Sequence, residues 1–125
     1  YCLTPNFKEF QEVVGNIDSD RELDEKAHNL VKKLKLNFLL ITRSENGISV
    51  YEKNYKSYHF PSETKEVIDV TGAGDTVIAI LASMLVRGKS FVEACKLSNR
   101  AAGIVVSKLG TSYLDQKYLQ KLFDN

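Results

Sequence analysis

Seven residues, Asp69–Asp75, combine glycines and carboxylates at the point where a β-like segment gives way to an apolar helical run. The segment reads Asp-Val-Thr-Gly-Ala-Gly-Asp, so Gly72 and Gly74 fall where a helix begins and Asp75 falls in its first turn. Each glycine costs roughly 1 kcal/mol against alanine inside a helix, so the pair needs a reason. Backbone without side chains can approach a ligand closely, and the positive end of a helix favours an anion. An acid beside an anion site indicates chemistry on a phosphate rather than storage of one.

The motif has two interpretations. As a plain strand-to-helix turn, it would use Thr71 as the N-cap, and Asp75 would only favour the helix dipole. As a phosphoryl-transfer site, the N–H groups of 72–74 would surround the transferring phosphoryl group, and Asp75 would face the attacking hydroxyl. A helix N-terminus favours the ionised carboxylate and makes Asp75 a weak base. In the second interpretation we therefore expect Asp75 mainly to orient the hydroxyl, with late proton transfer.

Two further segments have the composition of ligand sites. Asn6 and Glu9 place an amide and a carboxylate three residues apart, on one face of a predicted helix. Such a pair can hold a hydrated Mg²⁺, although a solvated first helical turn would look the same. Thr42–Gly47 leaves a buried strand through small polar residues and a glycine. This loop could cradle a phosphate or a ribose, or form a plain hairpin entry.

The run Gly88-Lys89-Ser90 resembles the end of a phosphate-binding P-loop, but Ser83 stands where the first glycine of that motif belongs. The context is also wrong, because a P-loop links a strand to a helix and this run ends a helix. We interpret Gly88 as the residue that follows a helix C-terminus, and Ser90–Glu93 as a capping box that opens the next helix.

Composition limits the partners and the compartment. The chain has 125 residues, the length of one domain, and a net charge of +1 with scattered basic residues. Neither a nucleic-acid nor a membrane partner is indicated, and the longest apolar run, Thr76–Val86, is too short to span a bilayer. Cys2 and Cys95 match no metal or redox spacing, which suggests buried or incidental thiols in a reducing compartment. The opening residue is not Met, and the apolar opening suggests a piece of a longer protein.

The elements that must position these residues follow an α/β pattern. The apolar run Phe38–Thr42 is typical of a strand buried on both faces, and Asn46-Gly47 predicts a hairpin after it. Strands are predicted at 1–4, 38–42, 48–52, 55–60 and 66–70, and helices at 6–14, 20–35, 74–87, 91–107 and 116–123.

Four blocks in order, 4–9, 42–47, 69–75 and 99–110, resemble the C-terminal part of the ribokinase-like (PfkB) carbohydrate kinases. The resemblance spans nearly the whole chain. It implies a Rossmann-type α/β sheet flanked by helices, and it makes residues 1–125 the C-terminal, ATP-binding part of a sugar kinase domain. ATP would be the phosphoryl donor, with Mg²⁺ and K⁺ as ions.

The same resemblance implies a role for individual residues. Asp75 corresponds to the catalytic aspartate. The anion hole would consist of Gly72, Ala73 and Gly74; the nucleotide site of Asn6, Glu9, Thr42, Ser44, Gly47 and Asn99; and the monovalent-cation site of Asp69, Thr71, Val105 and Gly110. One departure is Ser44, since many members of the family carry glycine at that position.

Within the family, the amino-acid sequences of segments 42–48, 69–79 and 101–112 most resemble the kinases that phosphorylate D-glycero-D-manno-heptose 7-phosphate for ADP-heptose and lipopolysaccharide synthesis. This implies a phosphorylated sugar as acceptor and a homodimeric, cytoplasmic enzyme. Because the N-terminal part of the family supplies the sugar pocket, we expect the 125 residues alone to be inactive. Another ribokinase-like sugar or nucleoside kinase, or a non-catalytic nucleotide-binding module, are the alternatives. The intact Asp75 argues against the last, because a pure binding site gains nothing from an acid facing an anion.

Overall fold

The computed structural model describes residues 1–62 and 73–106, except for the side chains of 45, 73–76 and 102–106. The predicted strand at 66–70 and helix at 116–123 lie outside these ranges. Contacts divide the chain into two compact units, Tyr1–Phe60 and Pro61–Asn125. Each unit is an assembly of its own, and each carries part of the predicted site.

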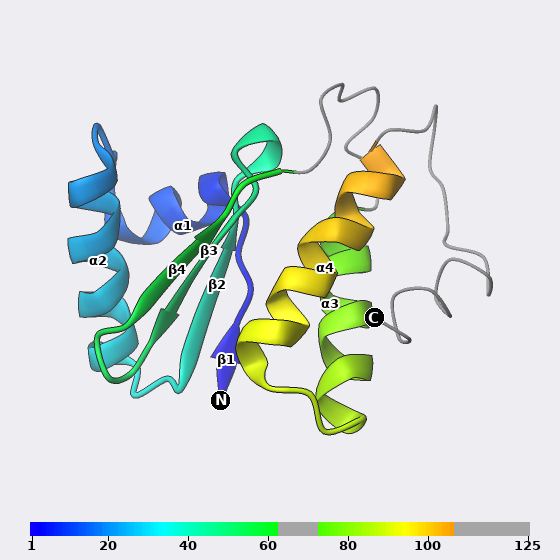
Figure 1. Ribbon diagram of the computed structural model, residues 1–125. Helices are drawn as coiled ribbons and strands as arrows, with labels where there is room; N and C mark the ends of the chain where they lie inside the picture. The colour runs from blue at the N-terminus through cyan, green and yellow to red at the C-terminus, as the bar shows by residue number, and fades with distance from the viewer. Residues whose placement is uncertain (63–72, 107–125) are drawn as a thin grey trace. The chain divides into compact units, whose positions relative to one another are not determined.

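The first unit is built on a sheet with the strand order β1-β2-β3-β4 (Figure 1). Its strands are β1 (Cys2–Leu3), β2 (Phe38–Thr42), β3 (Ile48–Glu52) and β4 (Ser57–Phe60). β1 pairs with β2 in parallel, whereas β2, β3 and β4 form an antiparallel meander. The predicted strands at 38–42 and 48–52 are confirmed, while β1 is shorter than the predicted 1–4 and β4 begins at Ser57 rather than Tyr55. Tyr55 has a φ of 67°, a left-handed conformation that belongs to the turn.

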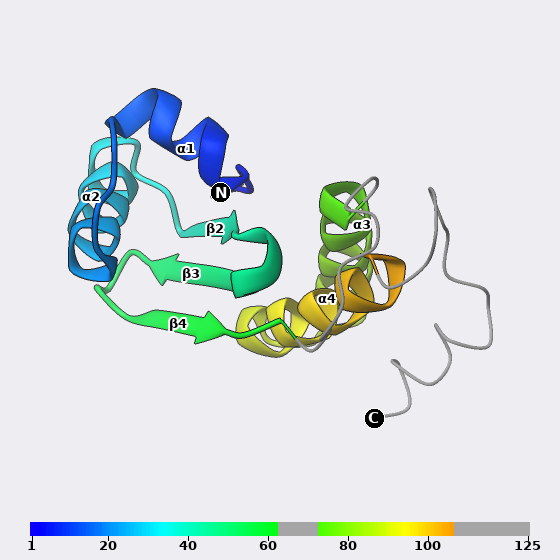
Figure 2. The same cartoon turned by 90° about the horizontal axis from the view of Figure 1, so that it is seen from above.

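Two helices, α1 (Phe7–Val14) and α2 (Asp20–Lys33), cover one face of this sheet (Figure 2). Their apolar stripes pack against the inward side chains of β2 and β3, and this forms the core of the unit. The buried members of this core are Phe10, Leu23, Ala27, Val31, Leu36, Leu39, Ile41 and Tyr51. Leu40 and Val50, which alternate with the core positions of their strands, are also fully buried. β2 is therefore buried along both faces, as its apolar run predicts.

The ends of α1 and α2 differ from the prediction by one or two residues. α1 begins at Phe7 because Asn6 is extended and caps the helix from outside. α2 begins at Asp20 with Ser19 as its N-cap: the Ser19 hydroxyl accepts a hydrogen bond from the Glu22 N–H at 3.1 Å. It ends at Lys33, and Lys35 follows in a left-handed conformation with a φ of 53°.

The second unit contains a helical hairpin of α3 (Ala73–Val86) and α4 (Phe91–Val106). Gly88 turns the chain with a φ of 82°, its N–H donates to the Leu85 carbonyl, and the Lys89 N–H donates to Met84. These two bonds are a Schellman motif. Ser90 and Glu93 then exchange hydrogen bonds at 3.2 Å as a capping box. The rejection of a P-loop here is confirmed.

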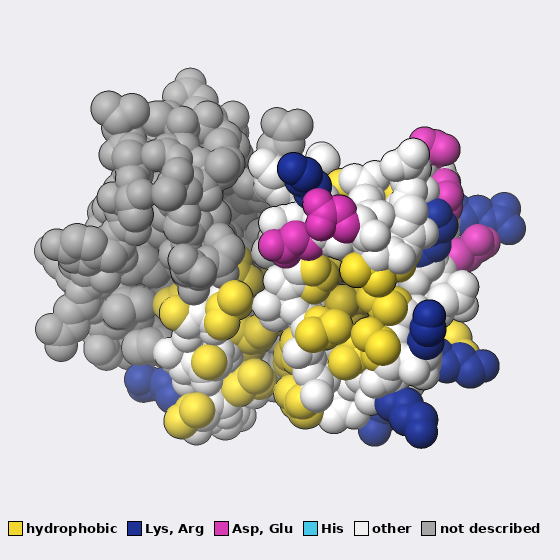
Figure 3. All heavy atoms as spheres, turned by 180° about the vertical axis from the view of Figure 1, so that it is seen from behind, with side chains coloured by type: hydrophobic (Ala, Val, Ile, Leu, Met, Phe, Trp, Pro, Cys, Tyr) yellow, Lys and Arg dark blue, Asp and Glu magenta, His cyan; other side chains and the backbone are white. Residues whose placement is uncertain are grey.

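Several large apolar side chains are exposed among the described residues. In the first unit these include Tyr1, Leu3, Val13 and Leu34, and Figure 3 shows hydrophobic side chains gathered on one face of the molecule. β1 is the outer strand of the sheet as described, and Leu3 on this strand is among the exposed residues. Proteins usually cover an exposed strand edge of this kind. No helix in the described part of the chain is long and apolar enough to cross a membrane.

The turn after α2 provides a test of the fold. Lys35 occupies the left-handed position that closes a Schellman motif: the Leu36 N–H donates to the Val31 carbonyl at 3.0 Å. Glycine adopts this conformation without a Cβ clash, but glycine also has more conformational freedom in the unfolded chain. With both effects counted, Lys35→Gly should stabilise the chain by about 0.5–1 kcal/mol. Urea denaturation measures the change. Lys35→Ala keeps the Cβ and is the matched control, and equal stabilities of the two variants would contradict the assignment.

Candidate functional site

The parallel pairing of β1 and β2 brings two predicted site segments together. The Thr42 N–H donates to the Pro5 carbonyl at 3.0 Å, and Asn6 forms a parallel bridge with Thr42. The first turn of α1 and the loop after β2 therefore leave the sheet side by side, at the carboxyl ends of adjacent parallel strands. Open α/β sheets bind their ligands at such ends.

Asn6 and Glu9 hold each other in a capping box at the start of α1. Asn6 Oδ1 accepts from the Glu9 N–H at 2.8 Å, and Glu9 Oε2 accepts from the Asn6 N–H at 2.9 Å. The cap was not predicted, although an N-cap residue followed three positions later by Glu is its sequence signature. The pair has a structural role at the helix end, and both side chains are exposed there.

The donor set of this pair fits Mg²⁺. Glu9 Oε2 is engaged by the cap, and the Glu9 side chain is exposed. Mg²⁺ prefers one or two carboxylates with several waters and phosphate oxygens, so a single exposed carboxylate is sufficient. Within residues 1–62 and 73–106, no group of three or more His, Cys, Asp or Glu side chains could hold a metal ion by itself.

The loop between β2 and β3 is closed by its own backbone. The Arg43 N–H donates to the Gly47 carbonyl at 2.8 Å, and the Gly47 N–H donates to Ser44 at 3.1 Å across a short 3₁₀ turn, η1 (Ser44–Asn46). Ser44 has a φ of 54° and Gly47 a φ of 80°. The left-handed conformation of Ser44 is one that glycine adopts more readily than serine, which is consistent with the glycine that the resemblance implies at this position. The predicted hairpin is thus confirmed. Two of the predicted site residues, Ser44 and Gly47, have positive φ angles in it.

A polar network lies behind this loop. The Arg43 guanidinium donates to Ser49 Oγ at 3.3 Å and to Asp20 Oδ1 at 3.2 Å, and Ser49 Oγ contacts His59 Nδ1 at 2.8 Å. The Tyr51 hydroxyl donates to Asp24 Oδ1 at 2.7 Å. Burial, with this bond to Asp24, raises the pKa of Tyr51 far above its ordinary value, so the hydroxyl stays protonated. This network could not be predicted from local patterns, because its members come from α2, the loop, β3 and β4.

In the second unit, α3 starts at Ala73, so Ala73, Gly74 and Asp75 form its first turn as predicted. The backbone N–H groups of a first turn have no acceptor within the helix, which makes them available to an anion. Val105 lies in the last turn of α4, where carbonyl groups are similarly available. The predicted residues Asp69, Thr71, Gly72 and Gly110 lie outside the described residues.

Asn99 is buried in α4, and its amide nitrogen donates to the Pro61 carbonyl at 2.8 Å. This bond ties the chain segment after β4 to the helix. Asn99 therefore has at least a structural role in its own unit, beside the adenine contact that the resemblance implies.

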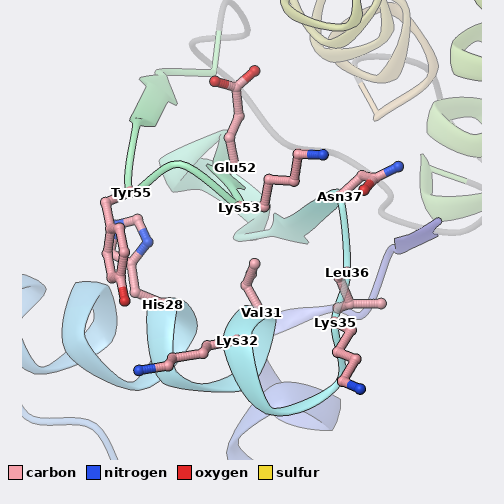
Figure 4. Close-up of a pocket in the computed structure, with 9 residues that line it drawn as sticks. All are labelled: His28, Val31, Lys32, Lys35, Leu36, Asn37, Glu52, Lys53 and Tyr55. Atoms are coloured by element: carbon pink, nitrogen blue, oxygen red, sulfur yellow. The ribbon is translucent and has the colours of Figure 1, made fainter.

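A hollow of about 490 Å³ lies at the other end of β2 from the loop. Its lining comes from α2 and the connection between α2 and β2, together with the end of β3 and the β3–β4 turn (Figure 4). The His28 ring packs edge-on against Tyr51, with 5.2 Å between centroids, and also contacts Tyr55. None of the predicted site residues lines this hollow, so it is separate from the candidate site.

The burial of the two cysteines agrees with the prediction of buried or incidental thiols, since Cys95 is buried and Cys2 is partly buried. Burial raises the pKa of the Cys2 thiol to about 11, so little of it is thiolate at neutral pH.

The fold is that of the ribokinase-like sugar kinases, and comparisons with known proteins establish the family. Residues 1–117 match the model of the pfkB family carbohydrate kinases, and the chain belongs to this family. It is 56% identical over 114 residues to the bifunctional protein HldE of Vibrio parahaemolyticus, which covers 91% of the chain and 24% of that protein. HldE of Pasteurella multocida is 56% identical over 110 residues. The chain thus spans about a quarter of the length of the curated relatives it matches.

Solved structures agree on the fold. Arabidopsis thaliana ribokinase, determined with ribose and ATP, superimposes with a TM-score of 0.85 at 26% identity, over 99% of the chain and 41% of that protein. Escherichia coli phosphofructokinase-2, determined with potassium, gives a TM-score of 0.85 at 17% identity, over 98% of the chain and 40% of that protein. The predicted α/β, ribokinase-like fold is confirmed.

The backbone of the loop provides a test of its geometry. Gly47 combines its φ of 80° with a ψ of −134°, a region that other residues rarely enter. Gly47→Ala should therefore destabilise the chain by about 1–3 kcal/mol. Ser44→Gly is the matched control, because it removes a Cβ from a left-handed position and should leave stability within about 1 kcal/mol of the wild type. Urea unfolding measures the stability change in both variants. A Gly47→Ala variant as stable as the wild type would show that the loop has another conformation.

Proposed function

We propose that this chain provides the nucleotide-binding and catalytic part of an ATP-dependent kinase that phosphorylates a sugar hydroxyl. The observation that carries the proposal is the juxtaposition of Asn6 with Thr42 at the carboxyl ends of β1 and β2. It brings the Asn6–Glu9 pair beside the loop that contains Ser44 and Gly47, as a nucleotide site of this family would require. Membership of the pfkB family supports the same activity.

In this proposal the reacting groups come from the start of α3. The N–H groups of Gly72, Ala73 and Gly74 stabilise charge on the transferring phosphoryl group, and Asp75 orients the acceptor hydroxyl and receives its proton late. The first turn of α3, which begins at Ala73, supports the presence of free N–H groups there. Asp75 suits this role because its position favours the ionised form.

The nucleotide and its ions are assigned to the remaining residues. Thr42, Ser44 and Gly47 contact ATP from the loop, and Asn99 lines the adenine pocket. Glu9 is assigned to the water shell of a bound Mg²⁺ ion. When bound, this ion would neutralise charge on the phosphates. A K⁺ ion is assigned to Asp69 and Thr71 with backbone near Val105 and Gly110. The last-turn carbonyl groups around Val105 support this ion site, and a protein of the same fold has been determined with potassium.

For the acceptor, we propose heptose 7-phosphate, with heptose 1,7-bisphosphate as the product, in ADP-heptose and lipopolysaccharide synthesis. The matches to HldE proteins at 53–57% identity support this choice over ribose, fructose or a nucleoside. A cytoplasmic homodimer is the corresponding assembly. The 125 residues alone are expected to bind nucleotide without phosphorylating a sugar.

The role of Asp75 can be tested in the protein as the cell makes it. Asp75→Asn removes the proton acceptor but keeps the size of the side chain, so turnover should fall by about 10²–10⁴-fold. The affinity for ATP should hold or rise, because a negative charge near the phosphates is removed. Glu12→Gln, at an exposed carboxylate of α1, is the matched control. Wild-type turnover in Asp75→Asn would remove this residue from the mechanism.

The acceptor can be identified by comparing kcat/KM for heptose 7-phosphate, fructose 6-phosphate, ribose and adenosine in the same protein. Heptose 7-phosphate should exceed the others by at least about 10²-fold, since sites that bind a substrate's polar groups reject analogues that lack them. A higher value for another acceptor would leave the kinase assignment intact and replace only the proposed sugar.

A further inference from the structure

Arg43 lies within the loop of the candidate nucleotide site, yet its side chain is directed away from that loop. Its backbone closes the loop from both sides: the N–H donates to Gly47, and the carbonyl accepts from the Asn46 N–H at 3.0 Å. Its guanidinium lies behind the loop, and only 19% of the side chain is exposed. A positive charge next to a phosphate loop would be expected to face the phosphates, so the opposite orientation calls for another role.

Three elements hold the guanidinium. Nη1 donates to Ser49 on β3, Nη2 donates to Asp20 in the first turn of α2, and the guanidinium carbon lies 5.8 Å from the ring centroid of Phe7 on α1. The planar fork of arginine suits this arrangement, because it donates in two directions while it lies over an aromatic ring. The salt bridge contributes little alone, because Asp20 is 85% exposed.

Ser49 is the buried hydrogen-bond acceptor in this arrangement. It is fully buried, and arginine has only donors, so Ser49 Oγ must accept from Arg43. Ser49 Oγ also lies 2.8 Å from His59 Nδ1, and His59 Nε2 lies 3.5 Å from Asp24. Burial and these contacts restrict the position of the acceptor that Arg43 reaches.

Phe7 connects this anchor to the other half of the nucleotide site. It is the first residue of α1 and directly follows Asn6, whose side chain forms the capping box with Glu9. Arg43 therefore contacts the first turn of α1 with its side chain while its backbone closes the loop that holds Ser44 and Gly47. Arg43 thus connects both parts of the candidate site, one through its side chain and the other through its backbone.

We propose that Arg43 is a positioning residue of the nucleotide site, which fixes the loop 43–47 against the first turn of α1 without contacting the nucleotide. This inference rests on the proposed function and deepens it. ATP then encounters a loop that already has its bound arrangement. When the anchor is lost, the loop samples other arrangements, and the apparent affinity falls by the fraction of time it spends in the competent one.

Two substitutions separate positioning from direct contact with a phosphate. Arg43→Gln removes the charge and the fork, whereas Arg43→Lys keeps the charge but cannot donate to Ser49 and Asp20 together. Positioning predicts that both raise the dissociation constant for Mg-ATP, by about tenfold if the loop is competent about a tenth of the time, with kcat nearly unchanged. Direct charge contact predicts that only Arg43→Gln does so, and that result would overturn the proposal.

Calorimetric titration of the full chain with Mg-ATP gives the dissociation constants, and turnover in the protein as the cell makes it gives kcat and the KM for ATP. Arg21→Gln is the matched control, because Arg21 is paired with Glu25 on the exposed face of α2. Val31→Ala, in the core of the same unit, controls for lost stability. Both controls should keep the wild-type affinity. A weakening in Val31→Ala equal to that in Arg43→Gln would reduce Arg43 to a general stability role and overturn the proposal.

Amide hydrogen exchange keeps this inference separate from the proposed function. The Asn46 and Gly47 amides donate within the loop, so they should lose protection in Arg43→Gln and Arg43→Lys whether or not nucleotide binds. Unchanged protection would overturn the positioning role. If the wild-type chain and the whole protein both fail to bind ATP, the proposed function is wrong, and the exchange result still decides whether Arg43 holds the loop.

Discussion

The candidate site depends on one pairing, the parallel contact between β1 and β2. β1 has only two residues, and the pairing continues past it through the bond from Thr42 to Pro5 and the bridge to Asn6. That register decides where α1 begins and where the loop after β2 leaves the sheet. A shift of one residue would turn the side chains of Asn6 and Thr42 to the opposite faces and separate the two halves of the nucleotide site.

Much of the architecture could be predicted because local patterns and tertiary packing agree. The apolar run Phe38–Thr42 is typical of a buried strand, and Gly88 followed by Ser90 marks the end of one helix and the start of the next. The placement of Ala73–Asp75 in a first helical turn was predictable for the same reason. In each case the residue type has a backbone preference that its surroundings also require.

The direction of side chains could not be predicted in the same way. Arg43 is adjacent in sequence to the loop, but its partners Asp20, Ser49 and Phe7 come from three other elements, and only the packing of α1 and α2 on the sheet reveals them. The Asn6–Glu9 cap shows the opposite error, because its local signature was present but was interpreted only as a ligand pair. Sequence patterns indicate which residues can do chemistry, and the packing decides which of them support the others.

The meander of the first unit has a consequence for the order of folding. β2, β3 and β4 are neighbours along the chain, so their pairing closes short loops, whereas β1 can pair only after the chain has closed over both helices. Closing the longer loop costs more entropy, and the two residues of β1 return few contacts for it. The Asn6–Thr42 bridge should therefore form late in folding and open early in local unfolding. Bound nucleotide would then stabilise the part of the unit that folds last.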